Sequence, residues 1–210
     1  MSQIWLVPAF PLLGFLLNGF LGKRFGTRFV TFVGPLAIAL SFAQSLVLFF
    51  QMLEAEGNVL KEHLYPWISS GNFEAGINFQ VDQLSGLYLL VITGVGFLIH
   101  VYSVGYMDGE SGYYRFFAYL NLFVFFMLIL VLGDSFLLMF VGWEGVGLCS
   151  YLLIGYYFEK DSAAEAAKKA FLFNRIGDFG VLSAVMLIFL AFGSIEFATI
   201  NAEAATQLEY

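Results

Sequence analysis

Long apolar runs separated by short polar stretches dominate this chain, and they predict six membrane-spanning helices. Each run is long enough to cross a bilayer core, and none alternates polar and apolar residues as a barrel strand does. The predicted spans cover residues 3–22, 29–53, 83–105, 114–133, 135–158 and 163–193. The predicted fold class is therefore all-α, a polytopic membrane protein of about six transmembrane helices.

The polar stretches predict how the spans are connected. Gly133-Asp134-Ser135 predicts a tight turn, which makes the fourth and fifth spans an antiparallel pair. Residues 54–82 form the longest polar stretch, and Ile77, Phe79 and Val81 alternate within it. Alternation of this kind predicts a short strand or hairpin, which we expect to form a loop on the outer face.

The sixth helix has its own start signal and an unusual length. Ser162 and Glu165 have the spacing of a capping box at a helix N-terminus. A helix from Ser162 to Gly193 is about 48 Å long, whereas a bilayer core is about 30 Å thick. We therefore expect its first turns to project into the cytoplasm.

Composition and charge exclude several functional classes. The chain is 60% hydrophobic and 12% charged, whereas soluble domains carry about 25% charged residues. The net charge of −7 and the absence of a basic stripe argue against nucleic-acid binding. The single Cys149 lies in a span and cannot form an internal disulfide. No sequence motif for a nucleotide, metal or haem is present, so we expect no cofactor in this chain.

Lys and Arg are distributed unevenly between the two sets of loops. Positive charge follows the first apolar run rather than preceding it, which predicts an outside N-terminus and no signal peptide. In that orientation the outside loops carry only Lys61, and Arg175 falls within a span. The cytoplasmic side carries the other seven cations: Lys23, Arg24, Arg28, Arg115, Lys160, Lys168 and Lys169.

Glu144 is a carboxylate near the middle of the fifth predicted span, about 16 Å from the Gly133 turn. An acid at that depth costs roughly 3 kcal/mol, and only a partner, a proton or a water-filled path relieves the cost. On a helical wheel, a seam of small residues (Gly142, Gly145 and Cys149) lies roughly opposite Glu144. We expect the helix to pack through the seam and to present Glu144 to another neighbour or a cavity.

The sixth span carries Arg175 and Asp178, which are three residues apart and can meet on one helix face. Counting from Phe192 places Asp178 about 22 Å from the outer end, deeper toward the cytoplasm than Glu144. The two acids can then form steps of one polar path. The alternative for Arg175 and Asp178 is a neutralised structural pair. Burial opposes ionisation of Glu144 and a facing cation favours it, so this carboxyl can serve as a proton carrier near neutral pH.

Two motifs carry a resemblance to a known family. They are Gly142-Trp-Glu-Gly-Val-Gly-Leu-Cys-Ser-Tyr-Leu-Leu-Ile-Gly-Tyr-Tyr157 and Ala166-Ala-Lys-Lys-Ala-Phe-Leu-Phe-Asn-Arg-Ile-Gly-Asp-Phe-Gly180. The segments 79–87 and 102–107 show the same resemblance. The chain resembles subunit L of bacterial respiratory complex I, the proton-translocating NADH:quinone oxidoreductase. It covers about the first third of that family's usual length, so we expect it to be the N-terminal part of a longer protein.

The resemblance implies an antiporter-like fold with two inverted repeats of five helices. On that pattern, residues 1–113 form an N-terminal three-helix region with an outside loop at about 54–82, and residues 114–210 begin the first repeat. Glu144 matches an essential glutamate that pairs with a lysine of a later helix, expected beyond residue 210. Asp178 matches an acid that tunes the site. Arg175 is not that lysine, and we expect it nearer Asp178 than Glu144.

The implied function is proton translocation through a Glu/Lys relay, driven by redox energy from elsewhere in the complex. NADH, FMN, iron–sulfur clusters and quinone are then expected in other subunits. The expected partners are other membrane subunits and lipid, and the expected location is the bacterial inner membrane. Two alternatives stay open: a subunit of a multi-subunit sodium/proton antiporter, and a structural membrane scaffold in which Glu144 carries no proton.

Overall fold

The computed structural model describes residues 3–71 and 73–207, and it contains six helices long and apolar enough to cross a membrane. The first span is composite, with α1 (Leu6–Leu16), a π-helical turn (Leu17–Leu21) and α2 (Gly22–Phe25). The other five are α3 (Thr27–Glu54), α4 (Gln83–Tyr106), α5 (Tyr113–Leu132), α6 (Phe136–Ile154) and α7 (Asp161–Phe192). The prediction of six helices is confirmed.

The end predicted for the fifth helix and the start predicted for the sixth differ from the structure. α6 ends at Ile154 rather than at residue 158, because a turn begins at Gly155. The capping box predicted at Ser162 and Glu165 is wrong. α7 begins at Asp161 after Lys160, without a side-chain cap, and the acidic Asp161 in its first turn suits the positive end of the helix dipole.

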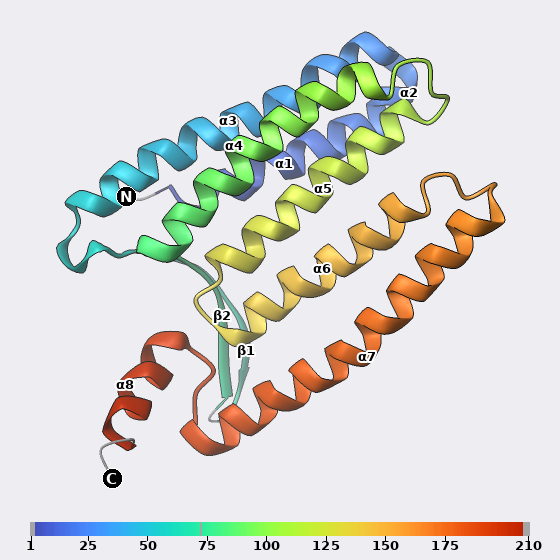
Figure 1. Ribbon diagram of the computed structural model, residues 1–210. Helices are drawn as coiled ribbons and strands as arrows, with labels where there is room; N and C mark the ends of the chain where they lie inside the picture. The colour runs from blue at the N-terminus through green and yellow to red at the C-terminus, as the bar shows by residue number, and fades with distance from the viewer. Residues whose placement is uncertain (1–2, 72, 208–210) are drawn as a thin grey trace.

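A β-hairpin follows α3 and confirms the strand prediction for the long loop. β1 (Leu60–Ser70) and β2 (Phe73–Val81) pair antiparallel, from Leu60 opposite Val81 to Ser70 opposite Phe73. β2 buries Phe79 and Val81 in the main core cluster, which explains the alternation in the sequence. Hydrophobic residues of β2 therefore tie the hairpin to the end of the helical bundle (Figure 1).

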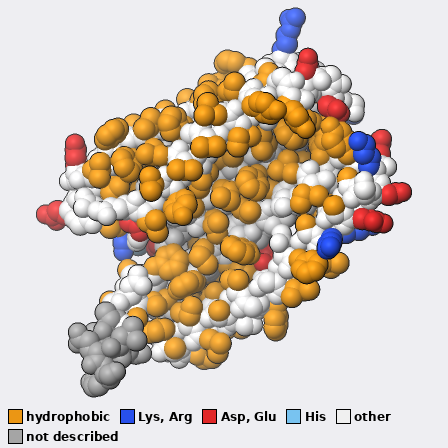
Figure 2. All heavy atoms as spheres, in the orientation of Figure 1, with side chains coloured by type: hydrophobic (Ala, Val, Ile, Leu, Met, Phe, Trp, Pro, Cys, Tyr) orange, Lys and Arg blue, Asp and Glu red, His pale blue; other side chains and the backbone are white. Residues whose placement is uncertain are grey.

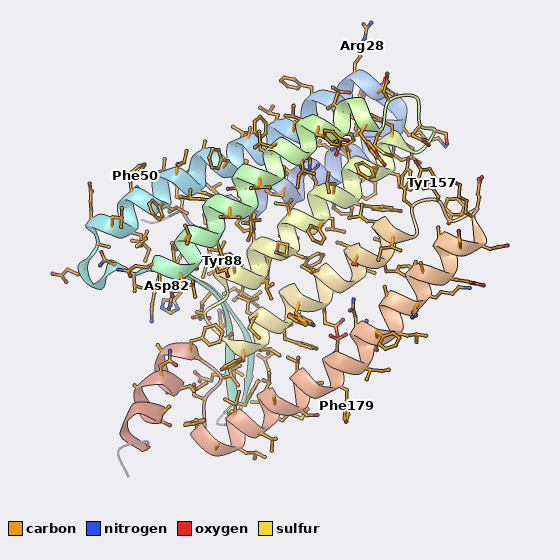
Figure 3. All side chains as sticks on the ribbon, viewed as in Figure 1. Arg28, Phe50, Asp82, Tyr88, Tyr157 and Phe179 are labelled. Carbon is orange, nitrogen blue, oxygen red and sulfur yellow. The ribbon has the colours of Figure 1, made fainter. Side chains whose placement is uncertain are left out.

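α1, α3, α4 and α5 form a bundle, with α6 beside α5 and α7 beside α6 at the edge (Figure 1). The α2–α3, α4–α5 and α6–α7 connections lie together at one end of the bundle. The spans present a largely hydrophobic surface, as lipid contact requires, with charged side chains concentrated at the ends (Figure 2). α7 is the least covered span, and its Phe179 points away from α6 (Figure 3).

A short helix, α8 (Phe197–Gln207), follows α7 and was not expected from the sequence. The segment before α8 is joined to the α5–α6 turn by a bridge between Ser135 and Glu196. The backbone N–H of Phe197 also donates to the carbonyl of Asp134. The same turn meets the hairpin through the bridge between Phe79 and Gly133. The α5–α6 turn is thus held at one end of the molecule by the hairpin and by the α7–α8 connection.

Candidate functional site

The small-residue seam of α6 packs directly against α5, as predicted. A Cβ atom added to Gly142 would collide with the backbone nitrogen of Leu130, and one added to Gly145 would collide with the ring of Phe126. Cys149 continues the seam and is fully buried. Because the two helices approach this closely on one face, the orientation of the opposite face of α6 is fixed.

The opposite face of α6 presents Glu144 to α7, where Arg175 meets it. Nη1 of Arg175 donates to both carboxylate oxygens of Glu144, each at 2.7 Å. The side chain of Glu144 is 24% exposed, and that of Arg175 is 52% exposed. The expectation that Glu144 faces a second neighbour is confirmed, and that neighbour is α7.

Arg175 also approaches Asp178, the second predicted acid. Its Nη1 lies 3.8 Å from Oδ2 of Asp178, whose side chain is only 7% exposed. The predicted pair of Arg175 and Asp178 is therefore present. The expectation that Arg175 lies nearer Asp178 than Glu144 is wrong, because the contact across the two helices is shorter than the contact within α7.

Trp143 completes the cluster and was not among the site residues predicted from the sequence. Its indole Nε1 donates to Oδ1 of Asp178 at 3.0 Å. A signal for it was present, since an indole N–H within a span needs an acceptor and Trp143 adjoins an acid. α6 thus supplies one acid and one donor, while α7 supplies the second acid and the cation.

The relative depth predicted for the two acids is also wrong. The bond between Trp143 and Asp178 places Asp178 level with the residue before Glu144, rather than deeper toward the expected cytoplasmic side. Counting from Phe192 assumed that α6 and α7 meet the outer face at equal depth. α7 instead reaches the hairpin tip, where the rings of Phe73 and Phe189 meet edge to face with centroids 5.0 Å apart.

The cluster has a simple charge balance. Two ionised carboxylates and one guanidinium leave it with a net charge of −1. The side chains of Glu144 and Asp178 also lie close enough to interact directly. One proton, or one further cation, would bring the cluster to neutrality, which is the cheapest state in a low-dielectric surrounding. This arrangement can therefore exchange a proton for another positive charge.

The structure offers no metal centre in the residues it describes, since no group of three or more His, Cys, Asp and Glu side chains converges there. A pairing of carboxylates with a guanidinium is suited to binding a proton rather than a metal ion, because the guanidinium already balances one of the two negative charges. The chemistry that these side chains support is protonation and charge pairing.

Two family models match the chain. Residues 67–117 match the N-terminus of chain 5 of NADH:ubiquinone oxidoreductase, complex I. Residues 133–209 match the transmembrane model of NADH:quinone oxidoreductase and Mrp antiporters. The second match contains every member of the cluster formed by Trp143, Glu144, Arg175 and Asp178.

Full-length relatives agree with the family models. The chain is 44% identical to NADH-quinone oxidoreductase subunit L of Mycobacterium tuberculosis, over 94% of this chain and 31% of that protein. It is 41% identical to subunit L of Escherichia coli, over 94% of this chain and 32% of that protein. It is 43% identical to NADH-ubiquinone oxidoreductase chain 5 of Marchantia polymorpha, over 94% of this chain and 29% of that protein. The chain thus spans about a third of the length of these relatives.

Solved structures show the same fold at lower identity. The Mrp complex from Dietzia aligns with a TM-score of 0.79 at 21% identity, over 94% of this chain and 20% of that chain. An archaeal membrane-bound sulfane sulfur reductase aligns with a TM-score of 0.78 at 22% identity, over 95% of this chain and 39% of that chain. Family models, relatives and fold agree on a multi-pass membrane protein. The chain belongs to the family of subunit L and chain 5 of NADH:quinone oxidoreductase.

Proposed function

We propose that this chain is part of a proton-translocating subunit in the membrane arm of respiratory NADH:quinone oxidoreductase. The observation that carries the proposal is the cluster of Glu144, Arg175 and Asp178, which sits between two spans and has one charge out of balance. The proposed location is a bacterial inner membrane with the N-terminus outside. Other subunits of the complex would bind NADH, FMN, iron–sulfur clusters and quinone.

In the proposed mechanism Glu144 carries the proton, and a lysine of a later helix competes with that proton for the carboxylate. The exposed parts of Glu144 and Arg175 leave this face of the cluster open to such a side chain. Approach of the lysine expels the proton, and its withdrawal allows a new proton to bind. Asp178 tunes the site through the guanidinium that it shares with Glu144.

The energy that this exchange requires is modest. Moving one proton against 100 mV takes about 2.3 kcal/mol, which corresponds to a change of roughly two pKa units in the proton-binding group. Adding or removing one unit charge a few ångströms from a carboxylate supplies about 4 kcal/mol at an intermediate dielectric. Movement of a single lysine is therefore sufficient, with the redox energy coming from other subunits.

The test is the substitution Glu144→Gln in the full-length protein within its assembled complex. We expect the complex to assemble and proton translocation to fall strongly, since an amide cannot carry a proton. Glu165→Gln is the matched control, because Glu165 lies on α7 outside the cluster. An unchanged ratio of protons to electrons in Glu144→Gln would favour the alternative of a structural scaffold.

A sodium/proton antiporter subunit is the second candidate, and one observation favours it: the model matched by residues 133–209 covers Mrp antiporters as well. The two candidates share the cluster, so the cluster cannot separate them. Transport measured in proteoliposomes does. Proton movement that requires NADH oxidation supports the respiratory assignment, whereas sodium-dependent proton movement without a redox substrate supports the antiporter.

A further inference from the structure

Phe171 lies against the cation of the cluster formed by Glu144, Arg175 and Asp178. The guanidinium of Arg175 is over the ring of Phe171, 4.9 Å from its centroid. Phe171 precedes Arg175 by four residues, so α7 places the two side chains on one face, one turn apart. A cation at this distance is attracted by the negative face of the ring. The contact therefore restrains an arginine whose side chain is 52% exposed.

Phe171 is itself supported by α6. Its ring meets the ring of Tyr151, with centroids 5.6 Å apart and planes inclined by 59°. Tyr151 follows Glu144 by seven residues, or two helical turns, and so lies on the same face of α6. That face of α6 therefore carries both the acid that Arg175 binds and the ring against which Phe171 packs.

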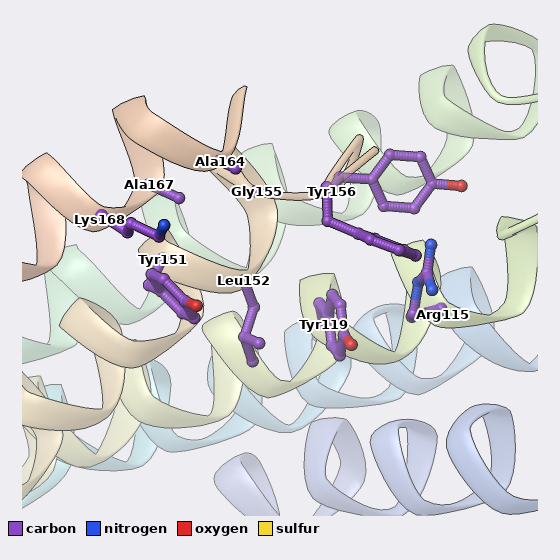
Figure 4. A pocket seen from close by; sticks show the side chains of 10 residues that line it. Arg115, Tyr119, Tyr151, Leu152, Gly155, Tyr156, Ala164, Ala167 and Lys168 are labelled. Atoms are coloured by element: carbon purple, nitrogen blue, oxygen red, sulfur yellow. The ribbon is translucent and has the colours of Figure 1, made fainter. Parts of the chain in front are cut away.

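Lys168 is a second cation of α7 at a spacing that can reach the ring of Phe171, three residues before it. It lines a cavity of about 190 Å³ instead, together with Tyr151. Figure 4 shows Lys168 and Tyr151 toward one side of this cavity and Arg115 toward the other. Among the described residues, Arg175 is the cation that lies over Phe171. The ring therefore acts on the cluster rather than on the cavity.

Restraint of Arg175 matters because its contacts with the two acids are unequal. Its Nη1 lies 2.7 Å from both carboxylate oxygens of Glu144 and 3.8 Å from Oδ2 of Asp178. A long, half-exposed side chain loses rotamer freedom when it pairs, and that loss weakens exposed ion pairs. A guanidinium already held over a ring has less freedom left to lose. The ring thus favours the arrangement in which one cation serves both acids.

We propose that Phe171 is a positioning residue of the proton-carrying site, and that it holds Arg175 against Glu144 with Tyr151 as its support. This inference rests on the proposed function, in which the charge of Arg175 balances one of the two carboxylates. Without the ring, the guanidinium spends part of its time away from the acids. Both carboxylates then lack their partner for that time.

The first test measures the rate of proton uptake into vesicles per assembled complex, with the full-length protein. Phe171→Leu should lower the rate about threefold, as loss of a cation–π contact at a half-exposed site predicts. Phe171→Tyr keeps the aromatic face and should restore most of the rate. Phe173→Leu is the matched control, because Phe173 is 67% exposed and lies on another face of α7. It should translocate protons normally.

A double-variant comparison separates positioning from packing. In the Arg175→Gln background, Phe171→Leu should cause no further loss, because no cation remains for the ring to hold. The same loss in both backgrounds would identify a packing role and overturn the proposal. A normal rate in Phe171→Leu, when Glu144→Gln abolishes translocation, would overturn it as well.

A cryo-EM map of the assembled complex tests the position of Arg175 without any measurement of activity. In Phe171→Leu the guanidinium should move away from Glu144, whereas in Phe171→Tyr it should stay. Unchanged contacts between Arg175 and Glu144 in Phe171→Leu would overturn the proposal. If the guanidinium moves but Glu144→Gln still translocates protons normally, the proposed function is wrong and the positioning by Phe171 stands.

Discussion

One nitrogen of Arg175, Nη1, lies 2.7 Å from both carboxylate oxygens of Glu144, across the interface between α6 and α7. The same nitrogen lies 3.8 Å from Asp178, so one cation serves two acids. A guanidinium shared in this way leaves a negative charge that a proton can balance.

Arg175→Gln removes the shared cation and leaves two carboxyl groups facing each other. We expect proton translocation by the assembled complex to fall by roughly fivefold, since a half-exposed ion pair contributes about 1 kcal/mol. Arg175→Lys keeps the charge and should restore part of the activity. The measurement is the rate of proton uptake into vesicles. Equal rates for Arg175→Gln, Arg175→Lys and the unmodified protein would contradict the role given to Arg175.

Trp143→Phe removes the donor of the hydrogen bond to Asp178, whereas Asp178→Asn keeps an acceptor but removes its negative charge. Each should cause a partial loss of proton translocation, because a hydrogen bond to a charged group contributes roughly 1.5–3 kcal/mol. Because the amide that replaces the carboxylate still accepts from the indole, but more weakly, Trp143→Phe should cost less in the Asp178→Asn background than it does alone. Additive losses, or complete loss in Asp178→Asn alone, would show that Asp178 does more than tune the site.

Gly142→Ala tests the seam that orients α6. The added methyl group would collide with the backbone of Leu130, so we expect a loss of roughly 1–3 kcal/mol and a lower melting temperature of the assembled protein. Gly96→Ala is the control, because its Cβ would lie 3.7 Å from Ile38 and Val124, an ordinary contact. If both variants melt at the same temperature, close packing of α6 on α5 does not set the stability.

Asp134→Asn tests the turn between α5 and α6. Burial raises the pKa of Asp134, and the negative charge of Glu196 adds to this, although Asn78, His63 and Lys61 act in the opposite direction. A raised pKa in the folded state means that folding favours the protonated acid. Stability is then lost as the pH rises from the unfolded value, about 4, through the folded pKa.

The variant, which stays neutral at every pH, should therefore melt at a higher temperature than the unmodified protein at pH 7. The difference should shrink as the pH is lowered toward 4. The measurement is the melting temperature of both proteins across that range. A variant that is less stable than the unmodified protein at pH 7 would show that the ionised carboxylate is the favoured form.

The apolar runs and their turns determined the six spans and the hairpin, because a membrane leaves few ways to satisfy the backbone other than helix. The seam of Gly142, Gly145 and Cys149 could also be predicted from the sequence, because only small residues let two helices approach closely. The face of α6 that carries Glu144 followed from the 3.6-residue period, as did the proximity of Arg175 and Asp178 on α7.

Only the tertiary structure decided how α6 and α7 align. The depth of Asp178 and the partner of Arg175 depend on how far α7 slides along its neighbour, and no local periodicity encodes that offset. Phe73 of the hairpin contacts Phe189 of α7, although more than a hundred residues separate the two in the chain. That packing brings Trp143 to Asp178 and Arg175 to Glu144, because side chains from two helices meet only at one relative position.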